Sequence, residues 1–137
     1  MNYLLDTNAC IAILNGRPIA VREKVTWAIG RQNTIYVSTV VAFELWYGVA
    51  KSARRPANED RLEAFFAGPV ELLPFDADDA RSAGVIRAQL EHQGRPIGAY
   101  DLLIAGQALR REITVITANT REFSRIAGLK WQDWTTD

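Results

Sequence analysis

Hydrophobic and polar residues alternate along the chain with two different periodicities, which predict strands separated by helices. Short runs of leucine, β-branched and aromatic residues predict strands at 3–6, 34–38, 70–75 and 113–117. Longer stretches predict helices from about Thr7 to Leu14, from Pro18 to Gly30, over 40–51, from Asn58 to about Gly68, from Asp76 to Gly94, from Ala99 or Tyr100 onward, and around Phe123 and Ile126.

This alternation predicts an α/β fold in which right-handed helical crossovers join parallel strands and helices cover both faces of the sheet. The sequence has no repeat and no long linker, so residues 1–137 are expected to form one domain. In open sheets of this kind, functional sites form at the carboxyl ends of the strands.

Composition excludes several classes of protein. Hydrophobic residues make up 48% and charged residues 23%, as in ordinary globular proteins. No apolar run approaches the roughly 18 residues of a membrane span, and the N-terminus lacks the basic start of a signal peptide. With a single cysteine, Cys10, we expect a cytoplasmic protein. Sixteen basic residues balance sixteen acidic ones, so net charge gives no indication of a nucleic-acid partner, although thirteen of the basic residues are arginine.

Three acidic residues occupy unusual places in this pattern. Asp6 follows the first strand directly, Glu44 lies within an apolar helix, and Asp101 lies in the first turn of another apolar helix. Each has a structural alternative: Asp6 as a helix N-cap, Glu44 as the partner of an arginine, and Asp101 as a charge on a helix dipole. Together they are three carboxylates from separate segments, which suit a hard cation such as Mg²⁺ or Mn²⁺.

The last predicted strand adds further candidates at its carboxyl end. Thr117 and Asn119 fall there, and Asn119 fits either a water-orienting role or a helix cap. Glu122 is a fourth acid of the site or a surface residue of the next helix. By contrast, Asp76, Asp78 and Asp79 are expected to be a solvated helix start. His92 is expected on the surface and Cys10 in the core.

The segments that carry these residues resemble a known family. LLDTNACIAIL, STVVAFELWYGVAKS, GRPIGAYDLLIAGQA and VITANTREFSRIAGL together resemble PIN-domain ribonucleases of the VapC toxin type, and they span essentially the whole chain. The closing WQDW resembles the tail of the VapC branch that cuts initiator tRNA.

The resemblance implies a three-layer α/β/α fold with a central parallel sheet of four to five strands. It implies that Asp6, Glu44 and Asp101 bind Mg²⁺, with Mn²⁺ as a substitute. The fourth site position of such enzymes is often an acid, but this chain has the neutral Asn119 there, with Glu122 as the alternative. The chain also has Ala99 where many relatives have proline.

The implied activity is hydrolysis of RNA, in the anticodon loop of initiator tRNA, leaving 5′-phosphate and 3′-hydroxyl ends. Arg95, Lys51 and Thr117 are candidate substrate-binding residues, and exposed solubility charges are the alternative for Arg95 and Lys51. Trp46 is expected either in the packed core or stacked on bases. The implied partners are a VapB-type antitoxin that lays a segment into the active-site groove, a second copy of the chain, and operator DNA read by the antitoxin.

Two other functions compete with this one. Haloacid-dehalogenase-like phosphatases also begin with a strand ending in Asp, but they need a second acid where this chain has Asn8. A degenerate PIN domain would act only as a binding module; the complete triad argues against it, while Asn119 keeps that alternative open.

Overall fold

The computed structural model describes residues 1–136, which form five strands and seven helices. In chain order these are β1 (Asn2–Leu5), α1 (Thr7–Asn15), α2 (Ile19–Gly30), β2 (Thr34–Ser38), α3 (Thr39–Ala50), α4 (Arg55–Ala67), β3 (Glu71–Leu73), α5 (Ala77–His92), α6 (Ala99–Arg111), β4 (Thr114–Ile116), α7 (Thr120–Phe123) and β5 (Trp131–Gln132). Within the described residues, no helix is both long and apolar enough to cross a membrane.

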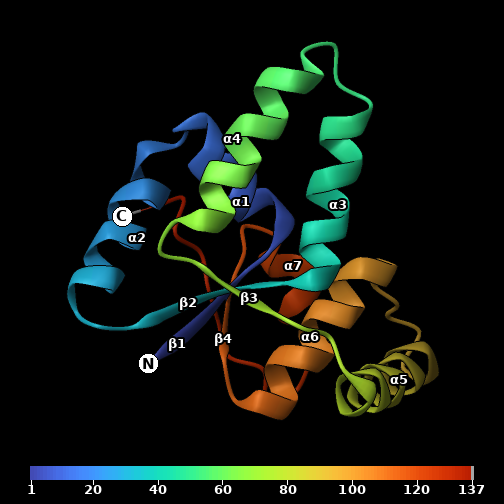
Figure 1. Ribbon diagram of the computed structural model, residues 1–137. Coiled ribbons are helices and arrows are strands. Elements are labelled where there is room, and N and C mark those ends of the chain that lie inside the picture. The colour runs from blue at the N-terminus through green and yellow to red at the C-terminus, as the bar shows by residue number, and fades with distance from the viewer. Residues whose placement is uncertain (137) are drawn as a thin grey trace.

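The strands form one parallel sheet in the order β3-β2-β1-β4-β5. Figure 1 shows α1 and α4 on one side of this sheet and α5 and α6 on the other, so the predicted three-layer α/β/α architecture is confirmed. The inner strand β1 is buried because it packs between these two helical layers, with Leu4 and Leu5 fully enclosed. Such two-sided burial is why this strand reads as a continuous apolar run.

The register of the sheet brings three segments to one edge. Leu5 pairs with Val37 of β2 and with Ile116 of β4. Because the strands are parallel, the residues that follow these positions lie side by side at the carboxyl edge. This edge therefore collects the residue after β1, the start of α3 and the loop after β4.

Two expected helix starts differ from the structure. α4 begins at Arg55, not at Asn58, because Pro56 fits the first turn of a helix, where its missing N–H is not needed. The side chain of Asn58 instead donates to the Ser52 hydroxyl, at 3.0 Å. Pro18 lies just before α2, at the N-cap position, and not inside its first turn.

The interpretation of the acidic start of α5 was wrong for one residue. Asp79 is fully buried, whereas Asp76 is exposed. The two carboxylates form a capping box at the start of α5, and both pair with Arg110 and Arg111 at the end of α6. A helix-start pattern cannot reveal this because the arginines lie some thirty residues further along the chain.

Packing between α5 and α6 is tight at a glycine. A Cβ atom added at Gly106 would lie 2.6 Å from the backbone of Ala83, so only glycine allows this approach. The ion-pair cluster and the glycine contact together fix α6 against α5. This matters for the site because α6 carries Asp101 at its other end.

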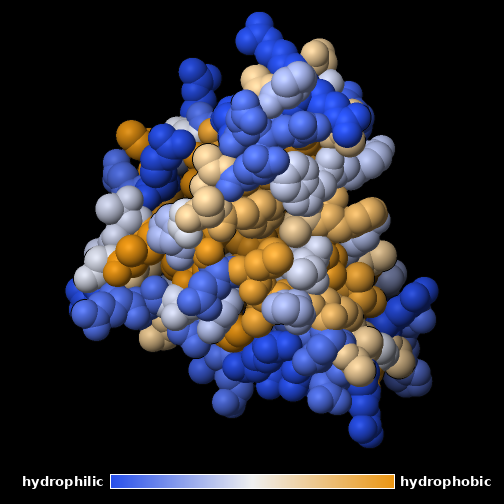
Figure 2. All heavy atoms as spheres, in the orientation of Figure 1, coloured by the Kyte–Doolittle hydropathy of each residue, from blue (hydrophilic) through white to orange (hydrophobic). Residues whose placement is uncertain are grey.

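The surface of the molecule is not uniformly polar. Figure 2 shows a band of apolar residues across the visible face, between more hydrophilic regions at the ends of α4 and α5. Exposed aromatic side chains of α3 and α6 include Phe43, Tyr47 and Tyr100. Cys10 is buried and His92 exposed, as predicted.

Candidate functional site

Asp6 is buried at the carboxyl edge of the sheet, with only 4% of its surface exposed. Its backbone N–H continues the pairing with β4 by donating to Ile116 at 3.1 Å, and its Oδ1 accepts from the N–H of Ala9 at 2.8 Å. Asp6 is therefore the N-cap of α1, as one of the two interpretations predicted. The cap uses Oδ1 and leaves Oδ2 available at the sheet edge, so a role in a functional site stays a prediction.

Burial raises the pKa of Asp6 to about 6. Hydrogen bonds from Thr117 and Ala9 act in the opposite direction, while the negative charges of Asp101 and Glu44 add to the rise. Asp6, Asp101 and Glu44 therefore lie close enough to repel one another electrostatically, although they come from three separate segments.

Glu44 lies in the second turn of α3, half-buried, and faces α1. Its Oε1 accepts a hydrogen bond of 2.7 Å from the hydroxyl of Thr7, the residue that follows Asp6. Within residues 1–136 no ion pair joins Glu44 to an arginine, so the alternative role as a structural salt-bridge partner is not realised. Thr7 instead ties Glu44 to the start of α1.

Asp101 lies in the first turn of α6, after the loop that ends at Gly98. Burial raises its pKa; the hydrogen bond from Asn119 lowers it, and the charges of Glu122 and Glu44 raise it further. The side-chain amide of Asn119 donates to Oδ2 of Asp101 at 2.9 Å. Asn119 precedes α7 but makes no side-chain cap there, so its amide serves the carboxylate and not the helix.

Glu122 is held beside Asp101 and is not a free surface residue. Its Oε1 accepts from the backbone N–H of Gly98 at 2.8 Å, and this bond is the main reason that its pKa is lowered. Thr117 forms the buried wall of the acidic site. The residue is 1% exposed, and its Oγ1 accepts a hydrogen bond from the N–H of Asn119 at 2.9 Å. The structure thus places both candidates for the fourth position of the site, Asn119 and Glu122, beside Asp101.

The chemistry of this set fits a hard divalent cation. Carboxylates from three segments lie at this edge of the sheet, and burial together with repulsion from neighbouring acids makes the charges of Asp6 and Asp101 costly without a counter-ion. Within residues 1–136, no three His, Cys, Asp or Glu side chains lie close enough to form a ready-made metal cage. Mg²⁺ does not need one, because it keeps several waters and takes only one or two carboxylates from a protein.

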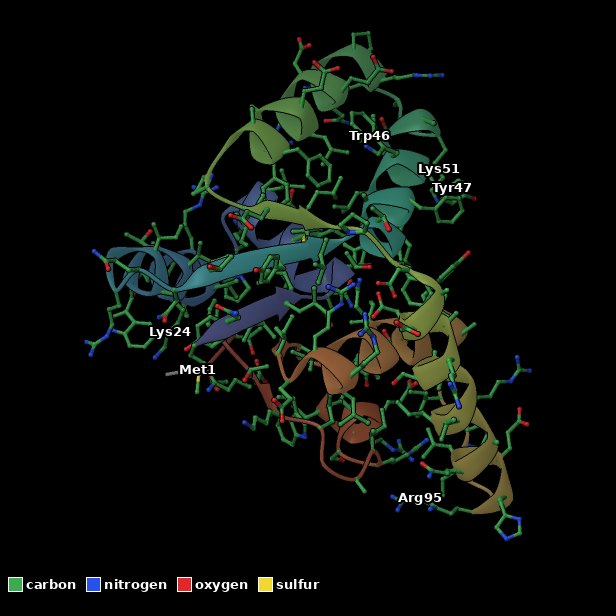
Figure 3. All side chains as sticks on the ribbon, turned by 60° about the horizontal axis from the view of Figure 1, so that its bottom comes forward. Met1, Lys24, Trp46, Tyr47, Lys51 and Arg95 are labelled. Carbon is green, nitrogen blue, oxygen red and sulfur yellow. The ribbon has the colours of Figure 1, made fainter. Side chains whose placement is uncertain are left out.

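Of the candidate substrate-binding residues, Thr117 hydrogen-bonds to Asp6, Lys51 directly follows α3, and Arg95 lies in the loop after α5. Figure 3 shows Tyr47 and Lys51 together on the outer side of α3, Trp46 turned toward α4, and Arg95 beyond the end of α5. The ammonium group of Lys51 lies 4.6 Å from the centre of the Tyr47 ring. Trp46 is not a core residue: it is 37% exposed and stacks on Phe66.

Sequence reasoning missed two features. One is the hydrogen bond from Thr7 to Glu44; a hydroxyl directly after a site acid was the available signal. The other is an apolar groove of about 290 Å³ between α1, α3 and α4, with Thr7 and Glu44 among its lining residues. No local pattern marks this groove, because its walls come from helices that are distant in sequence.

Comparison with known proteins places the chain in a family. The PIN domain model matches residues 3–129. The chain is 39% identical over 135 residues to the tRNA(fMet)-specific endonuclease VapC of Shigella flexneri, covering 98% of this chain and 99% of that protein. Among solved structures, it is similar to VapBC2 from Rickettsia felis bound to a DNA fragment from their promoter, at 36% identity and a TM-score of 0.91, covering 98% and 99% of the two chains.

A second solved structure agrees with the first. DNA-bound VapBC from Salmonella typhimurium is 37% identical, with a TM-score of 0.89 and 98% of both chains covered. The fold, the placement of the acids at the sheet edge and these likenesses lead to one conclusion: the chain belongs to the PIN-domain family and, within it, to the VapC group.

Proposed function

We propose that the chain is the toxin of a type II toxin–antitoxin pair and a Mg²⁺-dependent endoribonuclease, acting in the cytoplasm. The observation that carries this proposal is the meeting of Asp6, Glu44 and Asp101 at the carboxyl edge of the sheet, where burial and the neighbouring charges raise the pKa of Asp6 and of Asp101. The names of VapC relatives, endonuclease and ribonuclease, support the same activity.

The three carboxylates would hold the cation, one or two of them directly and the rest through its bound waters, and hydrogen bonds from other residues would orient the carboxylates. A bound divalent cation lowers the pKa of water and offsets charge that builds on a phosphate during hydrolysis. The hydrogen bond from Asn119 favours the ionised form of Asp101 and fixes its direction, and the hydrogen bond from Thr7 orients Glu44. Within this set there is no serine or cysteine nucleophile, so water would be the attacking group. The family resemblance implies that the products carry 5′-phosphate and 3′-hydroxyl ends.

For the substrate we propose an unpaired RNA segment, namely the anticodon loop of initiator tRNA. Support comes from the Shigella flexneri relative, whose name gives tRNA(fMet) as its target. Exposed aromatic rings next to the acids also favour unpaired bases, which stack on such rings. Tyr100 directly precedes Asp101, Phe43 directly precedes Glu44, and the two rings lie 6.0 Å apart.

For the partner we propose a VapB-type antitoxin that places an apolar segment in the groove between α1, α3 and α4. The groove is mainly apolar, and Glu44 lies at its wall, where a basic side chain of the partner would meet the acids. Solved neighbours are VapBC complexes, two of them bound to DNA, which supports operator binding through the antitoxin. We also propose a homodimer, supported by the exposed apolar band of Figure 2.

The nuclease activity has a direct test. Purified protein is incubated with total tRNA and Mg²⁺ or Mn²⁺, beside Asp101→Asn and the matched control Asp78→Asn, which makes the same change on an exposed turn of α5. We expect cleavage by the parent and the control but not by Asp101→Asn. Sequencing the new RNA ends names the target; equal cleavage by all three proteins would contradict the proposal.

A further inference from the structure

A second cavity lies on the other side of α1 from the apolar groove. It measures about 230 Å³, and its walls are mainly apolar, formed by α1, the start of α2 and the segments that follow β4 and β5. Ile11 lines both hollows, so α1 separates them. Pockets for small ligands are typically apolar with a few well-placed polar groups, and this one has such groups.

Three polar side chains at this cavity have unused hydrogen-bonding capacity. Within residues 1–136, the side chains of Asn8 and Arg17 make no hydrogen bond or ion pair, and both are exposed. Asp133 uses only one oxygen: its Oδ1 accepts from the N–H and the hydroxyl of Thr135, at 2.9 and 2.5 Å. Its Oδ2 has no partner among the described residues. These groups are therefore available to a polar occupant of the cavity.

The cavity adjoins the acid cluster through shared residues. Thr117 lines the cavity and hydrogen-bonds to Asp6. Ala9 also lines it, and the N–H of Ala9 donates to Asp6. A group bound in this cavity therefore lies next to whatever binds Asp6, which places it within the reach of one nucleotide from a phosphate at the acids.

Resting on the ribonuclease function proposed above, we propose that this cavity binds one unpaired nucleobase beside the phosphate that is cut, and that Asp133 selects guanine. A carboxylate oxygen only accepts hydrogen bonds. Guanine presents two adjacent donors, N1–H and the N2 amino group. Adenine, cytosine and uracil place an acceptor beside their donor, which the carboxylate repels. The guanidinium of Arg17 is available for the neighbouring RNA backbone.

Binding of short RNA tests the cavity separately from cleavage. In an Asp101→Asn background, we would measure fluorescence anisotropy with all-uridine hexaribonucleotides that carry one guanine or one adenine at the third position. We expect the guanine hexamer to bind about tenfold more tightly, since a good set of base contacts gives that order of discrimination. Ala118→Leu, which fills the cavity from an exposed position, should reduce affinity for the guanine hexamer about tenfold.

Asp133→Asn provides the sharper variant. Its amide oxygen can still accept from Thr135, but an N–H₂ donor replaces Oδ2. The preference for guanine should vanish while the affinity for the adenine hexamer stays or rises. Asp78→Asn is the matched control and should keep the preference, and thermal unfolding verifies that each variant folds.

The outcomes separate the two proposals. If the parent binds the hexamers but neither Ala118→Leu nor Asp133→Asn changes the affinity or the base preference, the cavity is not a base site. If these variants instead lower only the affinity for an antitoxin partner and leave RNA binding unchanged, the cavity receives a protein side chain and the inference is wrong. If the Asp101→Asn background binds no hexamer and the unsubstituted protein also cuts no RNA, the proposed ribonuclease function fails, and this inference fails with it.

Discussion

The side-chain amide of Asn119 donates a 2.9 Å hydrogen bond to Oδ2 of Asp101, across 18 residues of sequence. A neutral donor thus lies beside this carboxylate. Its N–H₂ group stabilises the ionised form of Asp101 and so opposes the rise in pKa that burial causes. The amide therefore prepares a carboxylate to accept a cation, without adding a negative charge.

This relationship predicts the effect of Asn119→Asp. The new carboxylate would repel Asp101 and raise its pKa further, so the metal-free protein should be less stable, by about 1–2 kcal/mol. The added charge should also increase affinity for Mg²⁺ severalfold. Urea unfolding at increasing Mg²⁺ concentration measures both quantities. Asn119→Ala, which removes the donor without adding charge, should lose stability and gain no affinity; identical Mg²⁺ dependence in the two variants would contradict the prediction.

The raised pKa of Asp6 predicts a pH-dependent loss of stability. The folded protein has a pKa of about 6 there, against 3.8 ordinarily, so folding binds a proton between these values. Without metal, stability should fall as the pH rises from about 4 to about 6 and stay lower above. Asp6→Asn removes this ionisation and should stabilise the metal-free protein at pH 7.5 by about 1–3 kcal/mol, with little effect at pH 4.

Urea unfolding with a chelator at both pH values provides the measurement for Asp6→Asn. Asp78→Asn, on an exposed turn, should change stability little at either pH. A loss of stability in Asp6→Asn at pH 7.5 would show that the N-cap hydrogen bond to Ala9 outweighs the cost of the buried charge.

Thr7 predicts a positioning effect on Glu44. Thr7→Val keeps the shape of the side chain but removes the donor that holds Oε1 of Glu44. Outer hydrogen-bond partners of metal-binding groups are typically worth 10–100-fold, so we expect kcat to fall at least about tenfold. Thr7→Ser, which keeps the hydroxyl, should recover most of the activity. An equal loss in both variants would indicate a packing role instead.

The sequence predicted the fold from its periodicity, and it predicted the meeting of the acids from one topological rule together with the family resemblance. Parallel strands bring the residue after β1 to the same edge as the loop after β4, so Asp6 could be placed there without coordinates. The partners of the acids could not be predicted. The hydrogen bond from Thr7 to Glu44 joins residues 37 positions apart in the sequence, and the one from Gly98 to Glu122 joins residues 24 positions apart. No local sequence pattern identifies partners at such separations.

The same limit explains the error at Asp79. Its local pattern, an acid in the first turn of a helix, is equally typical of a solvated residue. Burial of that carboxylate follows only from the arginines that α6 brings to it, and those lie 31 and 32 residues away. Long-range ion pairs are thus the part of this structure that sequence reasoning could least supply.

Asp79 predicts a stability effect of the opposite sign to that of Asp6. Burial acts to raise the pKa of Asp79, but hydrogen bonds from Arg111, the Asp76 backbone and Arg110 outweigh it and lower the pKa to about 2. The stabilisation is therefore present above pH 4 and is lost as the pH falls toward 2. Asp79→Asn should cost about 2–4 kcal/mol at pH 7, because it leaves arginines without their charge partner.

The test for Asp79 is urea unfolding of parent and variant at pH 7 and pH 2.5. The difference between them should shrink at the lower pH, where the parent also begins to lose the charge. Asp76→Asn serves for comparison: its side chain is 48% exposed in the same cluster, so its cost at pH 7 should be smaller. Equal costs for the two substitutions would mean that burial of Asp79 contributes nothing.

Gly106 links the packing of α5 to the site at the far end of α6. A Cβ atom at this position would lie 2.6 Å from both the Ala83 Cα and the Ala83 backbone nitrogen, so Gly106→Ala must push the two helices apart. We expect the free energy of unfolding to fall by about 1–3 kcal/mol, as for other overpacked positions, together with lower nuclease activity because α6 carries Asp101.

Gly84→Ala is the matched control for Gly106→Ala. It makes the same substitution within α5, where a Cβ meets nothing within 4 Å, and should stabilise the protein by about 0.5–1 kcal/mol. Thermal unfolding and cleavage assays on both variants decide the matter, since a mere change of helix propensity would stabilise both proteins alike.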